Sequence, residues 1–121
     1  PFLSQKDTPF AHYENGSGEL TLFLLAVIRL LLPKVLLPST TALRTLLPTG
    51  KEWGIVCGAN VIMPNLSPME ARKKYTLYDN KRIMGTEAAE QIAWLKKELA
   101  DMGYTVAISR GDSPMMEEQN H

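Results

Sequence analysis

Two short apolar runs of this chain each end at a proline that is followed by small polar residues. The first run, Val35–Leu37, is followed by Thr40 and Thr41, and the second run ends at Met63, just ahead of Asn65. In parallel α/β proteins the chemistry gathers where strands end and loops begin. Two hydroxyls beside the free N–H groups of a helix start can hold an anion. These four residues are therefore the first candidates for a functional site.

The same residues also have a structural explanation. Thr40 or Thr41 can serve as the N-cap of a helix that is predicted to begin at Ala42, since threonine is a common capping residue. A methionine at a strand end, such as Met63, more often fills an irregular gap in the core. Spacing alone favours a helix cap for the threonines and a core position for the methionine.

The segments around these candidates predict alternating strands and helices. Strands are expected over Val35–Leu37 and Asn60–Met63. The stretch between them is helical in pattern, and Pro48–Gly50 divides it into helices over Ala42–Leu47 and Lys51–Cys57. A βαβ unit has this pattern, and it implies a parallel sheet with helices covering both faces. The sequence therefore predicts the α/β fold class.

The apolar run Leu20–Leu32 predicts a buried helix and not a membrane span. It is too short to cross a bilayer, contains Arg29, and stops at Pro33. Ser17–Glu19 supply a capping residue and a carboxylate for the first turn. Because it is apolar on nearly all sides, we expect this helix to lie against a sheet inside a larger body, with Arg29 reaching out at its end.

The last part of the chain predicts two more helices and one more strand. The helices are expected over Pro68–Tyr75 and Glu87–Met102, and the strand over Thr105–Ile108. A polar tail follows from Ser113 and is expected to be flexible. We therefore expect one segment over residues 1–112 and a tail over 113–121.

Composition argues against several classes of protein. Thirteen Lys and Arg residues balance thirteen Asp and Glu residues, with no basic stripe, so neither nucleic acid nor a membrane is an expected partner. The single cysteine, Cys57, cannot form an internal disulfide or build a metal site by itself, and its apolar neighbours predict a buried structural thiol. The chain starts at Pro1 without a signal peptide, and we expect a piece of a longer protein.

Several motifs of the chain together resemble one family. They are PFLSQKDTPF, LTLFLLAVIRLLLPKVLLPSTTAL, CGANVIMPNLSP, RKKYTLYDNK and SRGD. They closely resemble the C-terminal barrel segment of the HydE family of [FeFe]-hydrogenase maturases, which are radical S-adenosylmethionine (SAM) enzymes related to biotin synthase. The resemblance implies a cytoplasmic protein, and it implies the last two to three βα units of a (β/α)8 TIM-type barrel, starting at the exit of the sixth strand.

The resemblance also implies roles for individual residues. Thr40 and Thr41 resemble paired hydroxyls at the end of the seventh strand, which bind an anion or the substrate carboxylate. Tyr78 and Met63 resemble further residues of the same pocket. The residues that resemble the SAM-binding side of the family are Phe2, Leu3, Tyr75 and Leu77.

The activity that the resemblance implies belongs to a complete enzyme. It is the reductive cleavage of SAM to a 5′-deoxyadenosyl radical, which attacks a sulfur-containing, iron-bound cysteine-type precursor during H-cluster assembly. The substrate is then a small molecule or an organometallic species, and other hydrogenase maturation proteins are the expected partners. The family holds its [4Fe-4S] cluster by a CxxxCxxC loop that is absent from this chain. We therefore expect the chain alone to be inactive and to hold no metal.

Two other interpretations of the sequence stay open. A biotin synthase or methylornithine synthase relative would carry different polar groups at the ends of the seventh and eighth strands. A non-catalytic scaffold or binding fragment would have no CxxxCxxC encoded in frame upstream of Pro1.

Overall fold

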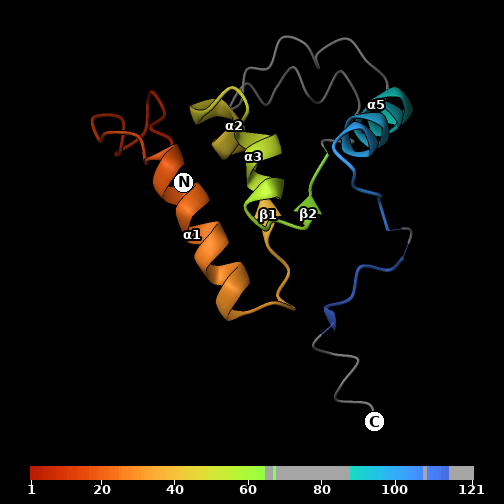
Figure 1. Cartoon of the computed structure of the whole chain (residues 1–121). Coiled ribbons are helices and arrows are strands. Elements are labelled where there is room, and N and C mark those ends of the chain that lie inside the picture. The colour runs from red at the N-terminus through yellow and green to blue at the C-terminus, as the bar shows by residue number, and fades with distance from the viewer. Residues whose placement is uncertain (65–66, 68–87, 108, 115–121) are drawn as a thin grey trace. The chain divides into compact units, whose positions relative to one another are not determined.

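The computed structural model describes residues 1–64, 67, 88–107 and 109–114, and these divide into two compact units, built on Pro1–Met63 and on Pro64–Asp112 (Figure 1). The described elements of the first unit are α1 (Gly18–Leu31), β1 (Pro38–Ser39), α2 (Thr41–Leu46), α3 (Gly50–Val56) and β2 (Val61–Ile62). The second unit contains α5 (Ala88–Asp101). The predicted helix over Pro68–Tyr75 lies outside the described residues.

The two strands pair in parallel, with Pro38 opposite Val61 and Ser39 opposite Ile62. Because α2 and α3 lie between them in the chain, the predicted βαβ unit is confirmed, and the mixed helix and parallel-strand structure agrees with the α/β class. The first strand was predicted over Val35–Leu37 and instead begins at Pro38. The reason is a side-chain hydrogen bond at Leu37, described below, which replaces the next backbone pairing.

A small apolar core joins α1, α2 and the segment that leads into β1. Its buried members are Leu25, Leu37 and Leu43, and Leu43 is only 1% exposed. The partly buried residues that pack against them are Leu22, Ile28, Val35, Leu47 and Cys57. Cys57 therefore contributes to packing, but it is partly buried and not fully buried as predicted.

Helix α1 begins where the sequence predicts, because the Ser17 hydroxyl oxygen accepts a hydrogen bond from the Leu20 N–H at 3.0 Å. The chain by itself buries only part of this helix, and the sheet of a larger body against which the helix was predicted to lie stays a prediction. The large apolar residues that the helix exposes are Leu20, Phe23, Leu24, Leu30, Leu31 and Leu32. The described part of the first unit covers one face of α1, through α2 and α3, and leaves the other face open. Among the described helices, including α1, none combines the length and apolarity that a membrane span requires.

Arg29 does not reach out from the end of α1, as the sequence suggested. Its Nε donates to the carbonyl oxygen of Gly58 at 2.8 Å, and its Nη1 donates to that of Pro33 at 2.6 Å. The last carbonyls of a helix have no partner within the helix, and the arginine folds back over this end. Gly58 allows the approach, because its φ is 112° and a Cβ there would lie 2.6 Å from the Arg29 Cβ.

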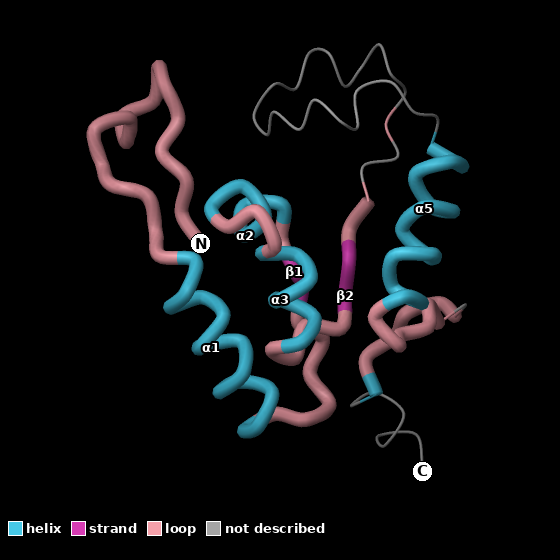
Figure 2. The backbone as a smooth tube through the Cα atoms, turned by 45° about the horizontal axis from the view of Figure 1, so that its top comes forward, coloured by secondary structure: helices cyan, strands magenta, loops and turns pink. Residues whose placement is uncertain are grey.

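The N-terminal residues form a closed loop ahead of α1. The Gly16 N–H donates to the Phe2 carbonyl at 2.9 Å, and the Ser4 N–H donates to Asn15 Oδ1 at 2.8 Å. Figures 1 and 2 both show this loop at the end of the unit where α2 lies. The start of α1 packs closely against Leu47, the residue that follows α2, because a Cβ at Gly18 would lie 2.6 Å from the Leu47 side chain.

In the second unit, α5 ends at Asp101, one residue before the predicted limit, and the predicted terminating glycine, Gly103, follows with a φ of 84°. The Gly103 N–H donates to Ala100 and the Tyr104 N–H to Leu99, which is the pair of bonds that closes a helix on a left-handed glycine. The predicted strand over Thr105–Ile108 is wrong for its described residues, 105–107, which have no strand structure. A strand needs a hydrogen-bonded neighbour, and the described part of this unit provides none.

Candidate functional site

The parallel pair brings two predicted site residues to one edge of the sheet. Ser39 lies opposite Ile62, so the residues that follow, Thr40 and Met63, leave the two strands at the same end. The arrowheads of β1 and β2 point the same way in Figure 1. Residues far apart in the sequence are thus neighbours at the carboxyl edge, where parallel sheets usually carry their sites.

The two threonines differ in their surroundings. Thr40 is the N-cap of α2, because its Oγ1 accepts a hydrogen bond from the Leu43 N–H at 3.3 Å. A hydroxyl that accepts one bond can still donate its hydrogen. Thr41 opens α2 with an exposed side chain, and its carbonyl oxygen accepts from the Thr45 hydroxyl at 3.0 Å. The capping explanation is confirmed for Thr40, while Thr41 is an exposed residue in the first turn of α2.

Ser39, which sequence reasoning missed, fixes the end of β1 against α3. Its side chain is only 6% exposed, and its hydroxyl donates to the Lys51 carbonyl oxygen at 3.1 Å. A Cβ at Gly54 would lie 2.6 Å from the Ser39 hydroxyl oxygen, so glycine allows the close contact of strand and helix. In the sequence, a serine between a proline and a threonine looks like an ordinary loop residue. The available signal was Gly54, since a glycine within a helix can mark the place where a strand packs closely against it.

Asn60, also missed, connects the start of β2 to the residue before β1. Its Oδ1 accepts a hydrogen bond from the Leu37 N–H at 2.8 Å. The N–H groups of Asn60 and Val61 both donate to the Leu37 carbonyl oxygen, at 2.9 and 3.0 Å. Leu37 is buried, so both of its backbone groups find partners away from water. A polar residue directly before an apolar strand was the available sequence signal.

Met63 stands at the end of β2 with 61% of its surface exposed. The core position that its residue type favoured is therefore wrong. The strand ends one residue earlier, at Ile62, so the methionine side chain has left the packed part of the unit. Its position leaves the thioether accessible at the same edge as Thr40.

Phe2 and Leu3 lie in the closed N-terminal loop. Phe2 is 44% exposed and Leu3 is half-buried. The rings of Phe2 and Phe10 meet edge to face with centroids 6.4 Å apart, and Phe10 meets Tyr13 at 5.7 Å. The loop therefore carries a partly exposed aromatic cluster at the end of the unit where α2 lies.

Four other candidates fall in segments that the structure does not describe. Asn65, Tyr75, Leu77 and Tyr78 lie outside the described residues. The pocket and SAM-side roles that the family resemblance implies for Tyr75, Leu77 and Tyr78 stay predictions.

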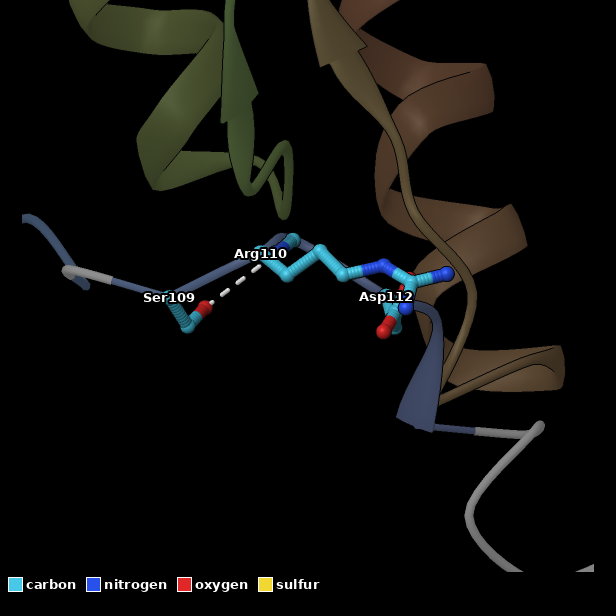
Figure 3. A network of polar contacts seen from close by, with 4 residues as sticks. Ser109, Arg110 and Asp112 are labelled. Atoms are coloured by element: carbon cyan, nitrogen blue, oxygen red, sulfur yellow. Dashed lines mark hydrogen bonds and ion pairs between the residues drawn. The ribbon is translucent and has the colours of Figure 1, made fainter.

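The SRGD motif of the second unit forms a polar turn that satisfies its own charges (Figure 3). Arg110 Nε lies 3.1 Å from Asp112 Oδ1, and both side chains are well exposed. The Gly111 N–H donates to the Ser109 hydroxyl oxygen at 3.3 Å. The guanidinium and the carboxylate pair with each other, so we assign no ligand to this turn.

The residues of this chain do not fit an iron-sulfur cluster. A [4Fe-4S] cluster in this family needs three thiolates, and the sequence has one cysteine. Cys57 packs against the apolar core, and within the described ranges no three His, Cys, Asp or Glu side chains come together in a metal-binding group.

Comparison with known proteins identifies a relative. No protein-family model matches the chain. Over 81 residues the chain is 47% identical to the [FeFe] hydrogenase maturase subunit HydE of Thermotoga maritima. The resemblance to HydE is confirmed. The match covers 67% of this chain but only 23% of the HydE relative, so the matched part of the chain spans about a quarter of that protein's length.

Proposed function

We propose that this chain is the C-terminal barrel part of a HydE-type radical SAM enzyme that acts in [FeFe]-hydrogenase maturation. The 47% identity to HydE carries the proposal. The parallel β1–β2 pair, with α2 and α3 between its strands, supports a βα segment of a larger barrel. Residues 1–112 would supply this segment, and 113–121 would form a tail. In this proposal the complete protein acts in the cytoplasm with other maturation proteins.

The chain would provide the substrate end of the barrel cavity. The Thr40 hydroxyl keeps a hydrogen to donate, and the Thr41 hydroxyl is exposed beside the first turn of α2. The N–H groups of a first helical turn have no carbonyl partner within the helix. Hydroxyl donors and backbone N–H donors therefore lie together at the start of α2. Together they would bind the carboxylate or another anionic group of the substrate, with Met63 and Tyr78 lining the same end.

The apolar edge for SAM would come from the N-terminal loop. The residues in this role would be Phe2, Leu3, Tyr75 and Leu77. In the complete enzyme the cluster and SAM supply the radical that attacks the sulfur-containing, iron-bound precursor. No set of residues in this chain fits the cluster. The functions that we assign to the chain are therefore to bind and orient the substrate and SAM and to exclude water from the cavity.

A chimeric enzyme tests this function directly. The segment of Thermotoga maritima HydE that matches this chain is replaced by the chain's own segment, and the chimera is expressed in a host that lacks its own HydE. We expect the chimera to restore hydrogen evolution by a co-expressed [FeFe]-hydrogenase. A folded chimera that binds its cluster but gives no active hydrogenase would contradict the proposal.

Valine variants of the chimera test the anion site. Valine has nearly the shape of threonine but cannot donate a hydrogen bond. We expect the double variant Thr40→Val/Thr41→Val to lower hydrogenase maturation at least tenfold, since charge-assisted hydrogen bonds are the strong ones. Thr45→Val, on the same helix, is the matched control and should mature hydrogenase normally. Equal activity of the double variant and the control would show that the two threonines do not bind the substrate.

A further inference from the structure

The hydrogen bonds around Leu37 depart from a regular parallel ladder. By extension of the observed register, Leu37 stands opposite Asn60. In a regular ladder the Leu37 carbonyl would accept from Val61 N–H, and the Leu37 N–H would donate to the carbonyl of Ala59. The first bond is present at 3.0 Å, but the Leu37 N–H donates to Asn60 Oδ1 at 2.8 Å.

The Asn60 side chain thus takes the place of a backbone carbonyl. The two residues before Asn60 form hydrogen bonds to helices and not to β1. The Ala59 N–H donates to the Gly54 carbonyl of α3 at 2.9 Å, and the Gly58 carbonyl accepts from Arg29 of α1. A backbone N–H can only donate, so the side-chain atom that faces Leu37 must be the oxygen. The side-chain bond from Asn60 is one of three that join the start of β2 to Leu37, and it is the one that gives the Leu37 N–H its acceptor.

We propose that Asn60 is a positioning residue of the candidate site, which sets the register of β2 against β1 and so brings Met63 level with Thr40. This inference rests on the proposed function. A slip by one residue would turn every side chain of β2 to the opposite face and would leave the buried Leu37 N–H without an acceptor. The residue beside Thr40 would then be Ile62 or Pro64.

Amide hydrogen exchange on the 121-residue chain measures the register without any assay of function. In Asn60→Ala we expect the Leu37 amide to exchange about tenfold to a hundredfold faster, because it loses its acceptor. Asn60→Asp keeps an acceptor oxygen and should retain the protection of Leu37. Asn15→Ala is the matched control, since Asn15 likewise accepts a backbone N–H, that of Ser4, but within the N-terminal loop.

Hydrogenase maturation by the chimera measures the positioning role. We expect Asn60→Ala to lower maturation at least tenfold and Asn60→Asp to restore most of it. Ser17→Ala removes the N-cap of α1 and destabilises the same unit without touching the strand pair, so it should mature hydrogenase normally at a temperature where all variants are folded.

Each outcome decides the proposal. Unchanged Leu37 exchange in Asn60→Ala, or no rescue by Asn60→Asp in either measurement, would overturn it. A loss of maturation in Ser17→Ala as large as in Asn60→Ala would also overturn it, because general destabilisation would then explain both. If the chimera with the natural segment fails to mature hydrogenase, the proposed function fails, and the exchange data still decide whether Asn60 sets the register.

Discussion

Arg29 Nε donates to the carbonyl oxygen of Gly58 at 2.8 Å, and this bond joins the end of α1 to the turn that leads into β2. The same guanidinium donates to Pro33, so one side chain closes the helix and holds the turn. Its Nη2 atom is buried and has no hydrogen-bond partner among the residues that the structure describes, a cost that the other bonds must offset. Arg29 thus connects α1 to Gly58, and two residues later Asn60 connects the same turn to β1.

Removing this arginine should destabilise the first unit. We expect Arg29→Ala to lower the free energy of unfolding by about 2–3 kcal/mol, since hydrogen bonds from charged groups contribute about 1.5–3 kcal/mol. Arg29→Lys should be intermediate, because an ammonium cannot reach both carbonyls as a planar fork does. Urea unfolding followed by Trp53 fluorescence, in a Trp94→Phe background, reports on this unit.

Arg44→Ala is the matched control for that experiment. Arg44 lies in the last turn of α2, where a cation contributes about 0.3–1 kcal/mol through the helix dipole. If Arg44→Ala lowered the free energy of unfolding as much as Arg29→Ala, the hydrogen bonds of Arg29 to Gly58 and Pro33 would not explain its contribution to stability.

The contact between Ser39 and Gly54 predicts a coupled pair of substitutions. A Cβ at Gly54 would lie 2.6 Å from the Ser39 hydroxyl oxygen, so we expect Gly54→Ala to cost about 1–3 kcal/mol through overpacking. In a Ser39→Ala background the oxygen is gone and the nearest remaining atoms, the Cβ of residue 39 and Leu43 Cδ2, lie 3.2 Å away, so Gly54→Ala should cost clearly less there. A double-mutant cycle by urea unfolding measures this coupling, and additive costs would contradict it.

The sequence predicted those parts of the fold that local chemistry determines. Ser17 starts α1 and Gly103 ends α5 because capping depends on residues adjacent in the chain. The sequence failed at Leu37, where the limit of the strand depends on a side chain from Asn60. The extent to which this chain covers α1 could not be predicted either, because the burial of an apolar face depends on which other elements are present to cover it.

The candidate site shows the same division. Thr40 and Met63 were found because strand ends are recognisable from apolar runs that stop at proline. Ser39 and Asn60 hold those strand ends in place, yet each looks like an ordinary polar loop residue in the sequence. Their importance comes from hydrogen bonds to Lys51 and Leu37, which only the folded structure brings within reach.

Substitutions of Thr40 and Thr41 should have different effects on the free energy of unfolding. Thr40→Val removes the cap of α2 and should cost about 1 kcal/mol, whereas Thr40→Ser keeps the hydroxyl and should be close to neutral. Thr41→Val changes an exposed hydroxyl and should alter the free energy of unfolding by less than about 0.5 kcal/mol. Urea unfolding checks all three. A large loss in Thr41→Val would mean that its effect on maturation in the chimera reports on folding and not on substrate binding.

The exposed apolar face of α1 should make the isolated chain self-associate. Phe23 is 63% exposed, Leu30 83% and Leu31 73%, and contiguous exposed apolar surface of this kind favours association. We expect sedimentation velocity to show oligomers for the natural chain and a shift toward monomer for Phe23→Lys/Leu31→Lys. Because both side chains are already exposed, the double variant should unfold at a similar urea concentration. Leu25→Lys, at a buried position of the same helix, should instead unfold the unit, and a natural chain that stays monomeric at high concentration would contradict the prediction.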